Sequence, residues 1–221
     1  MKLRAKDSKH SKSRLKGVTG IVLAGGKSSR FGSNKALIEI NGVRLIERVI
    51  NIMASVFERV ILITNTPQEY AYLQLPMHED LVKGLGPLGG ILTGLEAISD
   101  EAGFFMACDM PFLNSELVRH IVEARDDFDA VVPRMGWKIE ALHALFTKRC
   151  VPGIRALIDS GEYQIIKIFS KIRVRYVDEE EIRAFDPQLR SFFNVNRPEE
   201  LQNHQAFNTS KPSNKADRKM K

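Results

Sequence analysis

Cysteine is scarce in this chain, and long apolar runs are missing from it. Only Cys108 and Cys150 occur among the 221 residues, which excludes a disulfide framework and is typical of a protein in a reducing cytosol. No apolar run approaches the roughly 20 residues that a helix needs to span a bilayer, so we expect no membrane segment. The basic N-terminus lacks the apolar stretch of a secretory signal. These absences predict a cytoplasmic protein.

Charge is unevenly distributed along the chain. Of the formal net charge of +6, residues 1–16 carry +6 and residues 208–221 carry +4, so the body between them carries −4. Both ends are rich in Ser and Lys, and we predict that they are basic, disordered tails around one domain at 17–207. Solubilising termini are the commoner outcome for such tails, so nucleic acid is not expected as a partner.

Several common site signatures are also missing. A P-loop would need a glycine five residues before Gly26, where Ile21 stands inside an apolar run. The spacing of Gly25, Gly26 and Gly32 does not fit the dinucleotide-binding fingerprint. No Ser/His/Asp or Cys/His constellation stands out, and Cys108 is expected to be a small buried hydrophobe. The sequence therefore gives no indication of a covalent nucleophile.

A phosphate-binding stretch is present at residues 18–35. The β-branched, apolar run Val18–Leu23 predicts a buried strand, and Gly25 and Gly26 after it allow the backbone to approach a ligand closely. Arg30 then offers a fork for phosphate oxygens, and Lys35 offers a point charge. This combination predicts a site for the phosphates of a nucleotide. The alternative is a glycine-rich turn that binds nothing.

A carboxylate follows a second apolar run. Asp109 ends the segment G-F-F-M-A-C-D and is followed by Met110-Pro111. Mg²⁺ prefers one or two carboxylates together with substrate phosphates, so Asp109 is a candidate metal ligand. The alternative is that Asp109 only caps its own turn or the helix that begins after Asn114.

Strands and helices alternate through about residue 133, which predicts right-handed βαβ units and a largely parallel sheet in a three-layer αβα, Rossmann-like fold. In such sheets ligands bind beyond the carboxyl ends of the strands, where the glycine loop, Asn65 and Asp109 fall. We expect strands at 18–23, 59–65, near 77, 103–109, 129–133 and 173–177, extended segments at 36–40 and 139–146, and helices at 43–57, 67–75, 84–99, 114–124, 151–160, 164–172 and 198–203.

Together these residues predict phosphoryl-type transfer. Cations and Mg²⁺ would neutralise a triphosphate while an acceptor attacks the α-phosphorus in line and pyrophosphate leaves. If the acceptor is a phosphate monoester, its oxygens are already ionised near neutral pH and no general base is needed. Catalysis would then consist of positioning and charge stabilisation.

The chain resembles a known family, the molybdenum cofactor guanylyltransferases, which join GMP from GTP to molybdopterin. The resemblance covers about residues 18–204 and includes a double glycine, Gly25-Gly26, that is similar to the GTP-using members. It rests on L-A-G-G-K-S-S-R-F-G-S-N-K (Leu23–Lys35), G-P-L-G-G (Gly86–Gly90), C-D-M-P-F (Cys108–Phe112), E-A-L-H-A-L-F (Glu140–Phe146) and F-F-N-V-N-R-P-E-E-L (Phe192–Leu201).

The resemblance implies a nucleotidyltransferase fold of the glycosyltransferase A-like type, with a nucleotide-binding part at about 17–133 and an acceptor-binding part at about 134–207. It implies GTP and molybdopterin as substrates, Mg²⁺ as cofactor, and partner proteins for molybdenum insertion and molybdoenzyme maturation. Arg30, Lys35 and Asp109 would be catalytic, with Mg²⁺ on Asp109. The implied GTP contacts are Leu23, Ala24, Gly25, Gly26, Arg30, Lys35, Asn65, Asp80 and Asp109, and the implied acceptor contacts are Glu140, His143, Asn194 and Asn196.

Among the departures of the chain from the family pattern, which include Phe31 in place of the commoner Met, two concern predicted ligand contacts. Ile63 stands where some members carry an Asn that contacts the nucleotide, and Asn65 is taken as its substitute. Residues 163–165, Y-Q-I, lack the arginines often seen there. Two other readings stay open: a nucleotidyltransferase that uses CTP or a sugar-1-phosphate acceptor, and a nucleotide-binding module without turnover whose tails contact nucleic acid or a partner enzyme.

Overall fold

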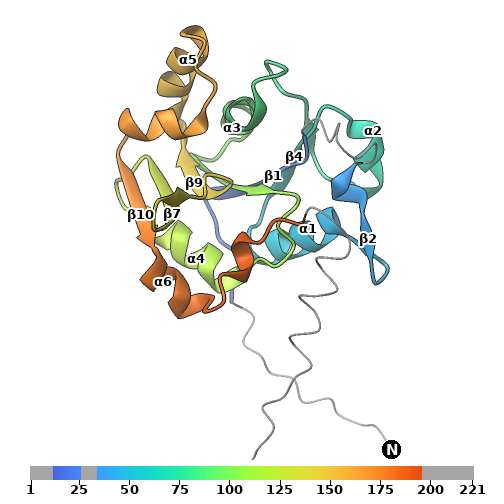
Figure 1. Ribbon diagram of the computed structural model, residues 1–221. Coiled ribbons are helices and arrows are strands. Elements are labelled where there is room, and N and C mark those ends of the chain that lie inside the picture. The colour runs from blue at the N-terminus through green and yellow to red at the C-terminus, as the bar shows by residue number, and fades with distance from the viewer. Residues whose placement is uncertain (1–11, 26–33, 196–221) are drawn as a thin grey trace, which may run out of the picture.

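The fold is built around one fully buried strand, β1 (Val18–Leu23), at the position that the sequence predicts. The computed structural model describes residues 12–25 and 34–195 (Figure 1). β1 pairs in parallel with a strand on each side, β4 (Val60–Ile63) and β6 (Ala102–Ala107). Strands buried on both faces read as continuous apolar runs, which is why this strand could be recognised in the sequence.

The main sheet has the strand order β10-β7-β9-β6-β1-β4-β5, with β8 paired to β7, and β2 and β3 form a separate two-stranded ribbon. The remaining strands are β2 (Glu39–Ile40), β3 (Val43–Arg44), β5 (Met77–His78), β7 (Ala130–Met135), β8 (Lys138–Ile139), β9 (His143–Thr147) and β10 (Val174–Asp178). The α-helices are α1 (Leu45–Val56), α2 (Pro67–Tyr70), α3 (Gly86–Ala97), α4 (Ser115–Glu123), α5 (Val151–Asp159) and α6 (Glu179–Phe185). The 3-10 helices are η1 (Lys35–Leu37), η2 (Ala71–Leu73), η3 (Lys148–Cys150), η4 (Ile165–Ser170) and η5 (Arg190–Phe192).

Helices cover both faces of the sheet, which confirms the predicted three-layer arrangement (Figure 1). One core lies between the sheet and helices α1, α4 and α6, and the other lies between the sheet and helices α3 and α5. Side chains alternate between the two along each strand, so Val22 faces the first core and Ile21 faces the second. The apolar faces of the helices are thereby buried on opposite sides of one sheet.

The sheet is mostly parallel, as predicted, but β9 runs against its neighbours. It pairs antiparallel with β6 on one side and with β7 on the other. Two reversals cancel, so β7 runs in the same direction as β6 and ends at the same edge of the sheet. β10 pairs in parallel with β7 and also ends there.

Several predicted elements differ from the structure. Residues 36 and 37, predicted as the start of an extended segment, belong to η1, because the Asn34 side chain accepts a hydrogen bond from the Ala36 backbone N–H (3.1 Å). The run predicted as extended at 139–146 is two strands, β8 and β9, and the helix predicted at 67–75 is α2 followed by η2. The helix predicted at 43–57 begins at Leu45, because Val43 and Arg44 pair with β2. The helix predicted at 164–172 is only the 3-10 helix η4. The helix predicted at 198–203 lies outside the described residues.

Helix α6 was not predicted, although the sequence contains its start signal. Asp178 is the N-cap, and its backbone N–H donates to Glu181 three residues later (3.4 Å), which is a capping box. The buried side chain of Ile182 then packs the helix against the first core. The D-E-E-E spacing at 178–181 is the signal that could have located this helix.

The N-terminal segment before β1 lies against the domain from Lys12 onwards. The Leu15 backbone N–H donates to the Val56 carbonyl (2.7 Å), and Arg119 Nη1 donates to the Ser13 carbonyl (2.8 Å). Arg119 is only 8% exposed, so this contact is made at a buried guanidinium. Residues 12–16, predicted as part of a disordered tail, are therefore anchored to α1 and α4.

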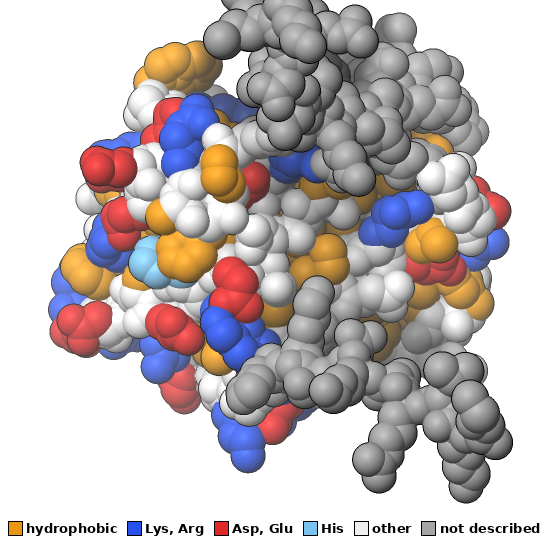
Figure 2. Space-filling view, turned by 90° about the horizontal axis from the view of Figure 1, so that it is seen from below, with side chains coloured by type: hydrophobic (Ala, Val, Ile, Leu, Met, Phe, Trp, Pro, Cys, Tyr) orange, Lys and Arg blue, Asp and Glu red, His pale blue; other side chains and the backbone are white. Residues whose placement is uncertain are grey.

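Charges of both signs are interspersed on the surface. Figure 2, which shows the molecule from below, has acidic and basic side chains side by side on its left, over α4 and α6. Arg175 and His120 both contact the Glu181 carboxylate there, at 2.7 Å and 3.3 Å. This part of the face is a mixed-charge surface rather than a basic patch. Within the described ranges, no helix has the length and apolar character needed to cross a bilayer.

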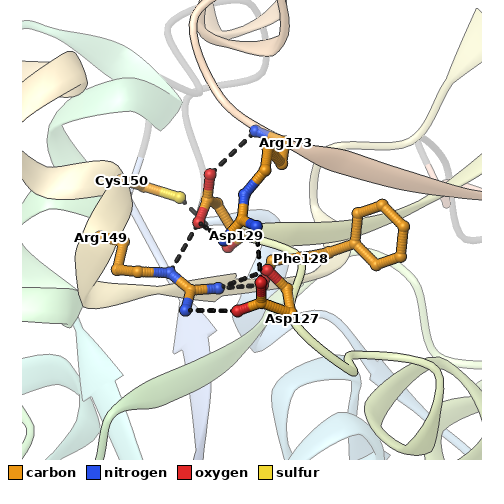
Figure 3. Close-up of polar contacts among 6 residues, drawn as sticks. All are labelled: Asp127, Phe128, Asp129, Arg149, Cys150 and Arg173. Atoms are coloured by element: carbon orange, nitrogen blue, oxygen red, sulfur yellow. Dashed lines mark hydrogen bonds and ion pairs between the residues drawn. The ribbon is translucent and has the colours of Figure 1, made fainter.

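A charge network holds the sheet together at the edge where β7 and β10 begin (Figure 3). The Asp129 carboxylate accepts from Arg149 Nε (2.6 Å) and from the Arg173 backbone N–H (2.8 Å). Its carbonyl accepts from the Thr147 N–H (2.8 Å), so one residue joins the ends of β7, β9 and β10. Burial raises the pKa of Asp129, but the hydrogen bonds from Arg173 and Arg149 outweigh this and the pKa is lowered.

We therefore expect Asp129→Ala to lower the free energy of unfolding by about 2 kcal/mol, because it removes the acceptor of the Arg173 backbone N–H and of Arg149 Nε. Asp127, whose side chain is 73% exposed, contacts the same two arginines and provides the matched control. Asp127→Ala should shift the urea midpoint much less. Equal shifts in the two variants would contradict this account of the network.

Candidate active site

The carboxyl ends of three parallel strands are level with one another at one edge of the sheet. In the strand register, Leu23 of β1 is paired with Ile63 of β4 and with Ala107 of β6. The Ala24 N–H donates to the Ile63 carbonyl (2.9 Å), and the Cys108 N–H donates to the Leu23 carbonyl (3.2 Å), so the alignment continues past the strand ends. The segments that follow these strands therefore start side by side, and all three contain residues predicted to bind the nucleotide.

The segment after β1 leaves space beside its backbone. Leu23 and Ala24 are 9% and 5% exposed, whereas Gly25 is exposed. A Cβ atom added to Gly25 would meet none of the described atoms within 4 Å. A ligand can therefore approach this backbone closely, as the sequence predicts. Gly26 and Arg30 lie outside the described residues.

The Asp109 carboxylate is half-buried just beyond β6. Its pKa is raised, chiefly by burial; the nearby ammonium group of Lys35 opposes the rise, and the Glu140 carboxylate adds to it. The structure thus brings Lys35, Asp109 and Glu140 into one electrostatic neighbourhood. A raised pKa means that the surroundings disfavour the carboxylate charge, which a bound cation would relieve.

Lys35 is positioned by a residue that the sequence analysis missed. Asn34 precedes it as the N-cap of η1. The Asn34 side-chain amide donates to Glu69 Oε2 and to Tyr70 Oη, both at 2.7 Å. Tyr70 is 1% exposed, and burial raises its pKa to about 12, so this anchor stays neutral at physiological pH. The preference of Asn for N-caps was the available signal.

Asn65 and Asp80 form a reciprocal pair on the β4 side of the edge. Asn65 Nδ2 donates to Asp80 Oδ2 (2.7 Å), and the Asp80 backbone N–H donates to Asn65 Oδ1 (3.1 Å). The next N–H, that of Leu81, donates to Thr93 Oγ1 (3.0 Å), and Thr93 is 2% exposed on α3. Two residues that are 15 positions apart are thus held together, with Thr93 as a second support that the sequence analysis did not identify.

Glu140 and Asn194 reach the same neighbourhood from the second half of the chain. Glu140 is 8% exposed and its Oε1 lies 2.5 Å from Lys138 Nζ. The segment that contains the exposed Asn194 runs beside Asp109, because the Val195 N–H donates to the Asp109 carbonyl (2.8 Å). Asn196 lies outside the described residues.

The structure does not bring His143 to the open edge, although the resemblance implies that it contacts the acceptor. Its side chain is fully buried, with ring centroids 5.6 Å from Phe104 and 4.8 Å from Phe192. Neither ring nitrogen has a hydrogen-bond partner among the described residues. Burial lowers the pKa of His143 to about 4, so the imidazole is neutral at physiological pH. Here His143 is a core residue.

The thiol of Cys108, next to Asp109, is not suited to nucleophilic chemistry. Burial raises its pKa to about 12, so the reactive thiolate is not formed near neutral pH. Cys108 and Cys150 are both free. This agrees with the prediction that Cys108 is a packing residue.

A magnesium ion fits this donor set only together with a substrate. Among the described residues, no group of three or more His, Cys, Asp and Glu side chains could hold a metal. Asp109 offers one carboxylate with a raised pKa at an open edge, and Mg²⁺ is commonly held by one or two carboxylates plus substrate phosphates. The residues present therefore fit a metal that is bound jointly with a triphosphate.

A mostly parallel sheet with an exposed glycine, a lysine and a metal-ligating carboxylate at its carboxyl edge is typical of the nucleotidyltransferase class. The family description "MobA-like NTP transferase domain" matches residues 20–177. A "Probable molybdenum cofactor guanylyltransferase" of Peptoclostridium acidaminophilum is 36% identical over 90% of this chain and 94% of its own length. A "Molybdenum cofactor guanylyltransferase" of Desulfosudis oleivorans is 38% identical over 86% and 95%.

A solved structure agrees with these matches. The crystal structure of "Molybdopterin-guanine dinucleotide biosynthesis protein A" from Archaeoglobus fulgidus is 27% identical, with a TM-score of 0.74 over 86% of this chain and 97% of that one. The chain belongs to the MobA-like NTP transferases and, among them, to the molybdenum cofactor guanylyltransferases.

The buried imidazole of His143 makes a testable contribution to stability. The folded pKa of about 4 is below the usual 6.5, so the unfolded chain takes up a proton between these values and the folded chain does not. Stability should therefore fall as pH falls, with His143 contributing about 3 kcal/mol of loss between pH 7 and pH 4.

Urea unfolding of the wild type and of His143→Leu across this pH range measures that contribution. We expect a shallower pH dependence in His143→Leu and an unchanged one in His78→Gln, since His78 is exposed. Parallel pH profiles for the wild type and His143→Leu would contradict a depressed pKa.

Proposed function

We propose that this chain transfers GMP from GTP to the terminal phosphate of molybdopterin and releases pyrophosphate. The observation that carries the proposal is the half-buried Asp109 at the edge where the ends of β1 and β6 are level. Burial raises the pKa of its carboxyl group, and the nearby Lys35 opposes that rise. That edge offers one cation and one metal-ligating carboxylate to a triphosphate. The predicted nucleotide-binding part at 17–133 contains both groups.

In the proposed step, an oxygen of the acceptor phosphate forms a bond with the α-phosphorus of GTP while the bond to the pyrophosphate oxygen breaks. The acceptor oxygen is already ionised, so no side chain has to remove a proton. Lys35 would neutralise charge on the phosphates, a role that Arg30 shares by prediction from the sequence. Mg²⁺, when bound, would further neutralise this charge, and Asp109 is the residue that would hold it.

The Asn65–Asp80 pair is our candidate for contact with the nucleoside. It lies beyond β4, on the far side of β1 from Asp109. Guanine presents two adjacent donors, N1–H and N2–H, to a carboxylate, whereas cytosine presents its amino group beside the N3 acceptor, which favours GTP over CTP. The proposed acceptor side is the β6–β9–β7 half of the edge, with Glu140 and Asn194. The protein partners and the cytoplasmic location stay predictions from the sequence.

Turnover with each triphosphate tests the reaction. Pyrophosphate release should require Mg²⁺ and molybdopterin and should be faster with GTP than with CTP. Release with CTP in preference to GTP would assign the chain to cytidylyl transfer. Release with neither would overturn the proposal and leave sugar-1-phosphates or binding without turnover.

Removal of the Asp109 charge should abolish turnover without loss of stability. Asp109→Asn is expected to lower kcat/KM at least about 100-fold, because the metal and the phosphates lose their anchor. The raised pKa shows that the folded protein disfavours this charge, so the neutral amide should leave Tm unchanged or higher.

Lys35→Ala should show the same loss of turnover with an unchanged Tm. Lys148 follows β9 at the opposite edge of the sheet, and Lys148→Ala is the matched control that should retain activity. A Tm that collapses in Asp109→Asn or Lys35→Ala would point to structural roles instead.

The nucleoside contact makes a separate prediction. Asp80→Ala should raise KM for GTP by about tenfold while KM for the acceptor changes little, because it removes a hydrogen-bonded carboxylate from the nucleotide side alone. Glu79→Ala is the matched control, since the neighbouring Glu79 is exposed and contacts Lys83 at 2.9 Å. Initial rates over a range of GTP concentrations distinguish the two. A rise in KM for both substrates in Asp80→Ala would contradict the assignment to the nucleoside.

A further inference from the structure

The one tryptophan of the chain is almost fully exposed. Trp137 is 93% exposed, more than any other large hydrophobic side chain among the described residues. It sits in a two-residue turn with Gly136, because Met135 of β7 pairs with Lys138 of β8. Gly136 has a φ of 59°, the left-handed conformation that such tight hairpin turns require. A well-defined hairpin therefore holds an indole ring out into solvent.

The hairpin stands at the same edge as Asp109. Phe146 of β9 pairs with Gly103 of β6 and with Ala130 of β7, so Ala130 is level with Gly103. β6 and β7 run in the same direction, so the hairpin that follows β7 and the turn with Asp109 that follows β6 stand at the same edge of the sheet. The two strands have β9 between them, which corresponds to two strand spacings or about 10 Å between their axes. Trp137 is thus on the β7 side of the edge that holds Asp109.

The residues after the hairpin connect it physically to that centre. Lys138 Nζ is held by Glu140 Oε1 at 2.5 Å, and Glu140 is close enough to Asp109 to raise its pKa. On the other strand, Arg134 donates to Asp178 (2.8 Å) and lies 4.5 Å from the centre of the Tyr176 ring. The base of the hairpin is therefore fixed by charge pairs, and the indole is the group left for a ligand.

The position of Trp137 indicates which of the two substrate rings, the guanine of GTP or the ring of the acceptor, it could contact. Gly25, Asn65 and Asp80 follow β1, β4 and β5, on one side of Asp109 in the sheet order. The hairpin is on the other side, beyond β9. A guanine held by Asn65 and Asp80 would lie away from Trp137, so a flat ring stacked on the indole belongs to the acceptor.

We infer that Trp137 is a specificity-determining residue that stacks on the planar pterin ring of the acceptor. The inference rests on the proposed function for the identity of the acceptor. Stacking between an aromatic side chain and a flat heterocycle needs only an exposed face, and it buries apolar surface that the free protein leaves in water.

Fluorescence tests the contact directly, because Trp137 is the sole tryptophan. Pterin-6-carboxylate, a stable pterin, should quench the emission saturably, and the same concentrations of GTP with Mg²⁺ should not. N-acetyltryptophanamide in place of the protein corrects for absorption by the pterin. Absence of saturable quenching, or equal quenching by GTP, would overturn the inference.

Steady-state kinetics of Trp137 variants provides a second test. Trp137→Ala should raise KM for molybdopterin about tenfold and leave KM for GTP within about twofold. Trp137→Phe keeps an aromatic face and should retain most of the affinity. Because the side chain is exposed, Tm should not change in either variant.

The outcomes separate this inference from the proposed function. If the wild type shows no turnover with GTP and molybdopterin, the proposed function fails. If the wild type turns over and Trp137→Ala has an unchanged KM for molybdopterin, only the stacking role fails, and the exposed indole belongs to another surface such as a protein contact. A rise in KM for GTP alone would place the ring on guanine and also overturn the inference.

Discussion

The site depends on the register of β1 with its two parallel neighbours. Because Leu23 is paired with both Ile63 and Ala107, three strand ends stop at one level and the segments after them begin side by side. This alignment brings residues that are distant in sequence, such as Asp80 and Asp109, to the same edge of the sheet. A slip of one residue would turn the buried side chains of β1 to the wrong faces, and burial of both faces prevents it.

Charged side chains stabilise the fold at one edge of the sheet and form the proposed active site at the other. At the edge where the strands begin, carboxylates are paired: Asp129 with Arg149 and Arg173, and Asp100 with Arg59 (2.6 Å) and Thr19 (2.6 Å). At the carboxyl edge, the Asp109 carboxylate is partly desolvated and has a raised pKa. The first arrangement satisfies its charges within the protein, and the second presents a carboxylate whose charge a bound cation would stabilise.

Much of this could be predicted from sequence because it is local. The run Val18–Leu23 and the carboxylate at Asp109 are read from consecutive residues; the structure forms β1 at the predicted bounds and places Asp109 two residues beyond the end of β6. The direction of β9 and the burial of His143 depend on tertiary pairing, which no local pattern shows. Once the pairing is known, alternation explains His143: it shares the parity of Leu145, which faces the first core, whereas Ala144 and Phe146 face the second.

The antiparallel β9 also determines which segment lies between Asp109 and the β7–β8 hairpin at the carboxyl edge. A parallel strand between β6 and β7 would end at this edge and place its following loop between Asp109 and the β7–β8 hairpin. β9 instead begins here, and residues 140–142 lead into it close to the sheet, with the Leu142 carbonyl accepting from the Ala107 N–H (3.2 Å). Glu140 and Ala141 are 8% and 6% exposed, so this connection is packed into the domain. The reversal of one strand thus places a short buried connection, rather than the loop that would follow a parallel strand, between Asp109 and the hairpin.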